Sequence, residues 1–281
     1  MLDKYELTKT VVVGNDMLQS EYYTQSELEL TVNQKRLLLY LISKINSDDT
    51  ELRTEEISIA DYCELFGISW SGGENRKHFR QSILALARKC FLLPIAPGQE
   101  QLFRWVGPVK IDYNIGKLYI RLDDSLKDYY IGLKNNYTIF QLGYAINFSS
   151  KYSYTIYEFL KSRANLQRVK ISVSDAKQQF AYGKYDNFAN FRKKVLDIAV
   201  REINAKSDIN VRYKATKKGV AYNEIQFFIA KKTGAALERV SDWKNQKIPT
   251  ETEKMDDFFD FDEQMRFDDF DEISVDFEEL G

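Results

Sequence analysis

Hydrophobic residues recur at helical spacing in two long segments of the chain. The first begins after Thr31 and continues to Ile45, and Gln34 stands where it can complete a capping box with Thr31. The second runs from about Ser150 to Leu160, with apolar and aromatic residues on one face. Both segments are predicted to form helices.

A short helix is predicted after each long one. The spacing Ser-x-x-Asp occurs at Ser58 and again at Ser172, and it places a serine hydroxyl at the first turn of each short helix. Each short helix is expected to end near a glycine, Gly67 in the first copy and Gly183 in the second.

The clearest repeat follows these short helices. Residues Asn75–Ala87 and Asn187–Ala199 share Asn, Phe, Arg, Leu and Ala at a constant offset of 112. Their apolar positions fit one helix face in each copy. The predicted inward residues are Phe79, Ile83, Leu86 and Cys90 in the first copy and Phe188, Phe191, Val195 and Ile198 in the second.

Strand-like alternation follows each repeated helix. Two strands with a turn near Asn114–Gly116 are predicted in Leu102–Leu122, and two with a turn at Lys217–Gly219 in Ile209–Ala230. The apolar pattern of Leu126–Leu142 predicts a helix that joins the halves.

The order helix, short helix, long helix and β-hairpin therefore occurs twice, as in a winged helix-turn-helix. The predicted fold is α+β, with two tandem winged-helix domains in pseudo-repeat. We expect a first winged-helix domain at 1–135, a second at 136–235, and a linker with an acidic tail at 236–281.

The free faces of the repeated helices carry cationic and amide side chains. Arginine, asparagine and glutamine can read base edges with two hydrogen bonds, whereas lysine more often contacts phosphate. The hairpin tip of the second half adds further cations that suit contact with the DNA backbone or the minor groove. The candidate DNA-binding residues are Asn75, Arg76, Lys77, Arg80, Gln81, Asn187, Asn190, Arg192, Lys193, Lys194, Arg201, Arg212, Lys217 and Lys218.

Charge is distributed unevenly along the 281 residues. Residues 248–281 hold 14 acidic and 2 basic side chains, a net charge of −12, so residues 1–247 carry +10 although the whole chain carries −2. A body with this charge favours a polyanionic partner. The tail alternates acids with phenylalanine and is expected to be disordered alone or to fold on a partner.

The sequence lacks the residues that several classes of function require. One histidine, His78, and two cysteines cannot build a histidine-rich metal site, and no Walker-type phosphate loop occurs. Cys63 and Cys90 are expected to be core thiols in a reduced cytosol, and His78 a surface residue or phosphate contact. We therefore expect a cytoplasmic protein that is no enzyme and has no metal, cofactor or membrane span.

Five segments together resemble the family of iteron-plasmid replication initiators, the Rep proteins with two winged-helix domains. The segments are Leu30–Leu38, Tyr137–Leu142, Lys151–Leu160, Phe188–Asn204 and Ser207–Val211. The resemblance extends over roughly residues 20–232. The acidic, phenylalanine-rich tail departs from the family core.

The resemblance implies a sequence-specific, non-enzymatic initiator of plasmid replication. Such proteins bind directly repeated origin sites as monomers, promote origin opening and recruit host replication proteins. As dimers, formed largely through the first winged helix, they often repress their own gene. The resemblance thus implies dimerisation and a DNA contact in 1–135 and the main reading of DNA in 136–235. Asn187–Lys194 would then make the main base contacts, and Asn75–Gln81 would take the neighbouring groove. The tail is a candidate for contact with a host replication protein.

Two alternatives stay open from the sequence. A dimeric winged-helix transcriptional regulator would bind an inverted site without opening DNA. An interaction protein would use the tail as its active part and the body as a scaffold.

Overall fold

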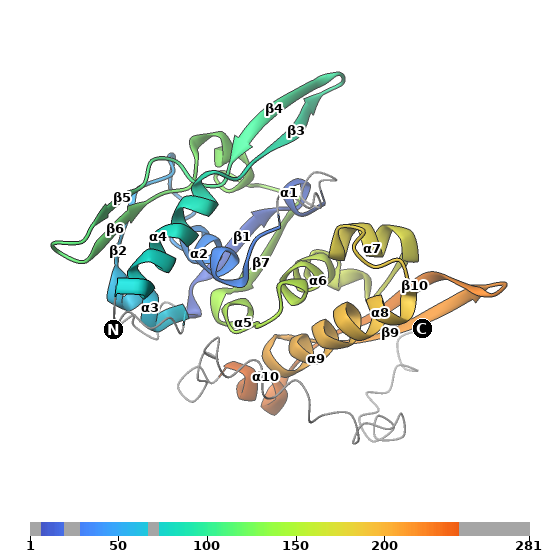
Figure 1. Ribbon diagram of the computed structural model, residues 1–281. Coiled ribbons are helices and arrows are strands. Elements are labelled where there is room, and N and C mark those ends of the chain that lie inside the picture. Colours follow the sequence, from blue (N-terminus) through green and yellow to red (C-terminus); the bar gives the residue numbers. More distant parts are fainter. Residues whose placement is uncertain (1–6, 20–28, 67–72, 242–281) are drawn as a thin grey trace.

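The computed structural model describes residues 7–19, 29–66 and 73–241 (Figure 1). It contains two winged-helix units side by side, which confirms the predicted fold. The predicted helix end at Gly67 and the predicted acidic tail from residue 242 onward lie outside the described residues.

The helices of the first unit start where their capping residues predict. Thr31 Oγ1 accepts from the Gln34 amide at 3.2 Å and Gln34 Oε1 accepts from the Thr31 amide at 3.1 Å, so a full capping box begins α2 (Val32–Ile42). Ser58 Oγ accepts from the Asp61 amide in the first turn of α3 (Ile59–Phe66). The long helix α4 (Gly73–Ala87) follows.

The first unit contains two hairpins, one more than the sequence pattern predicts. Strands β2 (Glu55–Ser58), β6 (Lys117–Ile120) and β5 (Lys110–Asp112) form one antiparallel sheet, with the predicted turn between β5 and β6. Strands β3 (Cys90–Ala96) and β4 (Gln99–Arg104) form a separate hairpin. The predicted single strand from Leu102 to Ile111 is wrong, because its two ends belong to different hairpins.

A two-stranded sheet replaces the predicted joining helix. A 3₁₀ helix covers Asp124–Tyr129, and β7 (Tyr137–Gln141) pairs antiparallel with β1 (Thr10–Gly14). In β7 the side chains alternate, with Thr138 and Phe140 buried and Tyr137 and Ile139 exposed, which suits a strand. The prediction of a helix over Leu126–Leu142 is therefore wrong.

The remaining element before the second unit is α1. It spans Asn15–Gln19 and directly follows β1. Because β1 pairs with β7, this pairing crosses the predicted domain boundary at residue 135.

The second unit repeats the plan of the first. Its elements are α5 (Leu142–Ile146), α6 (Lys151–Lys161), a 3₁₀ turn (Ala164–Leu166), β8 (Arg168–Ser172), α7 (Val173–Ala181), α8 (Phe188–Phe191), a π turn (Arg192–Leu196), α9 (Asp197–Lys206), β9 (Ile209–Lys218) and β10 (Ala221–Lys231). The sheet order is β8-β10-β9. The core of this unit includes an aromatic cluster of Phe159, Phe180 and Phe227.

A further helix, α10 (Gly234–Ser241), follows β10. The sequence predicted a linker from residue 236, so this part of the linker prediction is wrong. Val240 is buried, and Ser241 Oγ lies 2.9 Å from the hydroxyl of Tyr144 on α5. These contacts hold α10 against the second unit.

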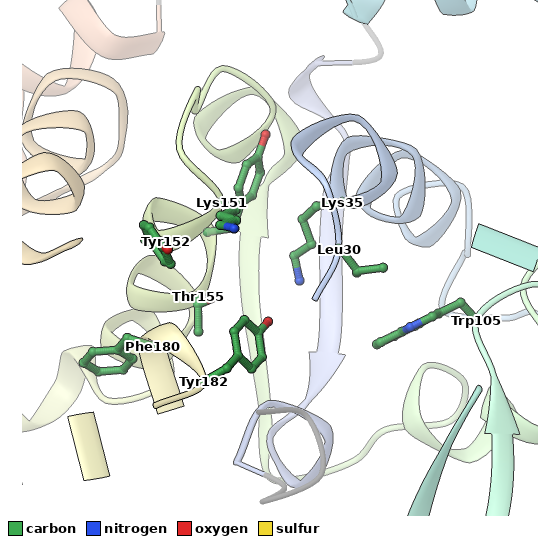
Figure 2. A pocket seen from close by; sticks show the side chains of 9 residues that line it. Leu30, Lys35, Trp105, Lys151, Tyr152, Thr155, Phe180 and Tyr182 are labelled. Carbon is green, nitrogen blue, oxygen red and sulfur yellow. The ribbon is translucent and has the colours of Figure 1, made fainter. Parts of the chain in front are cut away.

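Buried polar contacts join the two units. The guanidinium of Arg36 on α2 is fully buried and donates to the Phe148 carbonyl at 3.1 Å and to the Tyr154 hydroxyl at 3.3 Å. Figure 2 shows the adjoining cavity, where Lys35 and Trp105 of the first unit approach Tyr182 of the second. The cavity measures about 20 Å³, which is room for roughly one water molecule. The junction is thus closely packed.

Candidate nucleic-acid interface

Helix α4 separates an apolar face from a cationic one. Phe79, Ile83 and Leu86 are at most 2% exposed, and the Tyr62 ring of α3 lies edge-on to Phe79 with 5.3 Å between centroids. The opposite face is solvent-exposed at four candidate residues, Arg76, Lys77, Arg80 and Gln81. His78 is also exposed, and the side chain of Asn75 lies outside the described residues. The outward orientation predicted for these four residues is confirmed.

The predicted inward position of Cys90 is wrong. Helix α4 ends at Ala87, and Cys90 begins strand β3. Alternation along this strand turns Phe91 and Leu93 inward and leaves the Cys90 side chain exposed. Cys63 on α3 is buried as predicted, and burial raises its pKa to about 11.

In each unit we call the long helix of the repeat the reading helix: α4 in the first unit, and α8, the π turn and α9 together in the second. The second reading helix begins with an asparagine cap. Asn187 Oδ1 accepts from the Ala189 amide at 2.7 Å, and the Asn187 side chain is otherwise exposed. An asparagine can read adenine by using its oxygen and its NH₂ group together, and the cap already engages one of the two lone pairs of the Asn187 oxygen. Asn190, one turn later, is exposed on the same helix.

A π turn interrupts the second reading helix at its cationic residues. Arg192, Lys193 and Lys194 lie in the π turn and are exposed, whereas Val195 and Leu196 are fully buried. A π turn adds one residue per turn, and such bulges are frequent at functional sites. The π turn therefore accommodates three consecutive exposed cations before the next buried residue, Val195.

The π turn also changes which residues face the core. After it, Ala199 and Ile203 are buried, while Ile198 is only half-buried. The matching residue of the first copy, Leu86, is fully buried in the uninterrupted α4. The prediction of Ile198 as an inward residue is thus wrong: after the π turn the inward position is taken by the next residue, Ala199.

Asp197 organises the flank of the π turn. Its carboxylate accepts a hydrogen bond from the Tyr213 hydroxyl on β9 and lies 3.8 Å from Nε of Arg192. Burial and the hydrogen bond to Asp197 raise the pKa of Tyr213 well above its usual value, so this hydroxyl keeps its proton. Sequence reasoning missed Asp197, because its partner Tyr213 is sixteen residues away on another element.

An aromatic stack joins the wing to the reading helix. The rings of Phe188 on α8 and Tyr222 on β10 stack with 4.3 Å between centroids and an interplanar angle of 27°. Lys217 Nζ lies 4.9 Å from the Tyr222 ring centroid, on the same side of the hairpin. Phe188 was predicted to face the core. It is half-buried, packs against the core and also forms this stack.

The structure divides the wing cations between two faces. Arg212 pairs with Phe228 in the β9–β10 ladder, and the neighbouring pair, Tyr213 with Phe227, faces the core. Because side chains alternate along a strand, Arg212 lies on the face turned away from α9. Lys218 lies an even number of residues after Arg212, so its side chain is on the same face as that of Arg212. Lys217 lies on the opposite face, on the side of the reading helix.

Arg201 is exposed on α9, beyond the π turn. Its neighbour Glu202 faces the interior of the unit, where its carboxylate accepts from the amides of Ser149 and Ser150 at 2.9 and 3.0 Å. Glu202 thereby ties α9 to the start of α6, the helix that carries the contacts with the first unit.

Glu29 gathers lysines from three segments near the second reading helix. Its carboxylate pairs with Lys151 and with Lys184, and its carbonyl accepts from Lys89. Burial opposes ionisation of Glu29, but the hydrogen bonds from Lys151 and Lys184 outweigh it and lower its pKa. The sequence could not indicate this cluster, because its members are up to 155 residues apart.

Two further observations concern metal ions and membranes. Across the described residues, no group of three or more His, Cys, Asp or Glu side chains is placed to hold a metal ion. In the same part of the chain, every helix is too short or too polar to cross a membrane.

Comparison with known proteins then identifies the family. Residues 11–161, more than half of the chain, match the family described as "Initiator Replication protein, WH1". Residues 176–229 match "Initiator Rep protein, WH2". The chain belongs to the initiator Rep protein family. It is thus a DNA-binding replication initiator with two winged-helix domains.

A solved structure shows the same fold. The Pi initiator protein, solved in complex with iteron DNA, is similar with a TM-score of 0.63 and 21% sequence identity, covering 81% of this chain and 99% of that chain. Domains 2 and 3 of RctB give a TM-score of 0.44 and 13% identity, covering 72% of this chain and 81% of that chain.

Proposed function

We propose that this initiator Rep protein starts plasmid replication by binding directly repeated sites at an origin with both winged helices. The observation that carries the proposal is the pair of reading helices, each with a buried apolar underside and an exposed face of cations and amides. The Pi initiator protein, which has the same fold, was solved with iteron DNA and supports repeats as the target.

The exposed side chains divide into two roles in this proposal. Arg80 and Gln81 on α4, and Asn190 and Arg192 on the second reading helix, would read base edges with paired hydrogen bonds. The other candidates would hold phosphates and set the register. They are Asn75, Arg76, Lys77, Asn187, Lys193, Lys194, Arg201, Arg212, Lys217 and Lys218.

Origin opening would draw on binding energy rather than on catalysis. Bending or untwisting the site costs free energy, and the extra contacts that the deformed DNA allows offset this cost. Buried contacts such as Lys35 with Glu158, at 2.7 Å, support this because they keep the two reading helices in one arrangement. The proposal therefore includes no nuclease or ATPase step.

The proposal also covers assembly and location. We place dimerisation and a first DNA contact in residues 1–135 and the main DNA reading in 136–235, with monomers on the repeats and a homodimer that represses the gene. Residues 236–281 would include the contact with a host replication protein, in the cytoplasm. Copy control would follow from the balance between monomer and dimer.

The test uses full-length protein and the DNA beside its own gene. Gel-shift titrations should show binding to direct repeats at least a thousandfold tighter than to random DNA, the lower end for specific DNA-binding proteins. Permanganate footprinting should then detect unpaired thymines in an adjacent AT-rich segment, and deletion of the gene should stop plasmid replication.

Two outcomes would contradict the proposal. Equal affinity for repeats and random DNA would show that the protein is not a sequence-specific initiator. Tight binding to an inverted site, without permanganate reactivity and with normal replication after deletion, would instead indicate a dimeric transcriptional regulator.

A further inference from the structure

The wing of the second unit ends in an exposed apolar residue. Strands β9 and β10 are joined by the two-residue turn Gly219–Val220, and Val220 is 96% exposed. Gly219 has a φ of +67°, which the first central residue of such a turn requires. Polar residues are common in turns, and Val220 buries almost nothing within the protein.

The outer part of this hairpin has a fixed place beside the reading helix. Tyr222, two residues after Val220, stacks on Phe188 in the first turn of α8, and Nζ of Lys217 lies 4.9 Å from the centroid of the Tyr222 ring. The first turn of a reading helix is the part that enters the major groove. A tip held next to it meets the neighbouring groove, and beside a major groove that is the minor groove.

The wing of the first unit has the same character. Ile115 lies in the turn between β5 and β6 and is 60% exposed. The Asp112 carboxylate accepts from the amides of Asn114 and Ile115 at 3.1 and 3.4 Å, which shapes the turn that presents Ile115. Figure 1 shows the two wings extending toward opposite ends of the molecule.

We propose that the Gly219–Val220 turn enters the minor groove beside the site read by α8 and the π turn, where Val220 packs on the floor of an A·T base pair. This inference rests on the proposed function. Lys217 and Lys218 hold the phosphates that border the groove. Ile115 makes the equivalent contact at the other end of the site.

The chemistry of the groove makes Val220 a specificity determinant. The minor-groove floor of an A·T pair lacks the guanine N2 amino group that projects from a G·C pair. An apolar side chain can therefore approach an A·T pair closely. At a G·C pair it covers the N2–H that points into the groove and leaves that N–H without a hydrogen-bond partner. Val220 thus selects A·T pairs without any hydrogen bond to a base.

Inosine separates this reading from contacts in the major groove. An inosine·cytosine pair resembles G·C in the major groove but lacks the N2 amino group, so in the minor groove it resembles A·T. The probe is a duplex with the site that full-length protein selects from random-sequence DNA. Each A·T pair flanking the site is replaced in turn by G·C and by inosine·cytosine.

Three forms of the full-length protein complete the experiment. For wild type, G·C at the pair under the wing should weaken binding roughly tenfold, and inosine·cytosine should restore it. Val220→Thr, which is close in shape but polar, should lose this discrimination. Val220→Ile, which stays apolar, should keep it. Because residue 220 is exposed at a turn, all three forms should fold alike.

Three results would overturn the inference. They are equal binding of the G·C and A·T duplexes, an inosine·cytosine duplex that behaves like G·C, and a Val220→Thr protein with wild-type discrimination. In each of these the protein still binds its selected site, so the proposed function survives. Failure to select any site would instead contradict the proposed function.

Discussion

Lys35 on α2 and Glu158 on α6 form an ion pair across the junction of the two winged helices. Nζ of Lys35 lies 2.7 Å from Oε1 and 2.8 Å from Oε2 of Glu158, and the two side chains are 11% and 4% exposed. Removing one partner of a buried pair leaves an uncompensated charge in the interior, which is costly. The pair therefore couples the stability of one unit to contact with the other.

Substitution of Lys35 tests this coupling. Lys35→Met should lower the free energy of unfolding by about 3–5 kcal/mol, and Lys35→Met with Glu158→Leu should recover most of the loss because no charge stays buried. Urea denaturation measures both. Lys170→Met, at the exposed pair with Glu224, is the control and should change stability little. A Lys35→Met protein as stable as this control would contradict the prediction.

Much of the fold could be predicted because local signals agree with the tertiary structure. The capping residues Thr31, Ser58 and Ser172 all cap the helices that they predict. The exception is β7, whose apolar residues also fit a helical face. Its state depends on pairing with β1, more than 120 residues earlier, and a pattern within one segment cannot reveal that partner.

The candidate site was less predictable than the fold. The π turn at Arg192–Leu196 changes the helix phase, so positions before it, such as Phe191, fit the repeat while Ile198 does not. Partners such as Asp197 and Tyr222 were missed because they join different elements. The outward orientation of a side chain follows from the periodicity of its helix. The contacts that position it, such as those of Asp197 and Tyr222, form only between elements of the folded chain.

The Phe188–Tyr222 stack should position the wing for DNA. Tyr222→Ala removes a stacked pair of the kind that contributes about 0.5–1.5 kcal/mol, and the wing loses its fixed place beside α8. We expect weaker binding to the selected DNA site, with the free energy of unfolding lowered by no more than about 1.5 kcal/mol. Tyr222→Phe keeps the ring and should bind like wild type. Fluorescence anisotropy with a labelled duplex compares the three proteins.

Arg192 and Lys193 should have different effects on DNA binding. Arg192→Ala should reduce discrimination between the selected site and its single-base variants by about 1–3 kcal/mol. Lys193→Ala should weaken binding to all sequences alike and reduce the slope of log affinity against log salt by roughly 1.

Arg121 provides the matched control for these two variants. It is paired with Asp124 through two hydrogen bonds of 2.7 and 2.8 Å, and it lies on neither reading helix. Arg121→Ala should leave discrimination and salt slope unchanged. If Arg192→Ala kept wild-type discrimination, base reading would have to be assigned to other residues.

Lys232 should make stability depend on pH in the alkaline range. Burial lowers the pKa of Lys232 to about 8, whereas an unfolded lysine titrates near 10.4. Between these values the unfolded chain binds more protons, so stability should rise with pH through this window. The gain is complete above the unfolded pKa and is lost as pH falls to about 8.

Comparison of two lysine variants isolates this effect. Lys232→Met should flatten the rise in unfolding free energy between pH 8 and about 10, whereas Lys231→Met, an exposed neighbour, should keep it. The upper limit matters because burial also raises the pKa of Tyr157, and such tyrosines lower stability above pH 10. Identical pH profiles for the two variants would refute the assignment.

The acidic tail should compete with DNA for the cationic body. Residues 248–281 carry −12 and residues 1–247 carry +10, so the tail acts as a tethered polyanion whose attraction weakens with salt. Deleting 248–281 should tighten binding to random DNA at low salt and steepen the salt dependence, because more counterions are then released from the DNA. Anisotropy titrations over a range of salt concentrations measure both quantities. A tail in which the acids are replaced by serine should behave like the deletion if charge is the cause. Equal affinities of the full and shortened chains at low salt would show instead that the tail leaves the DNA-binding faces uncovered.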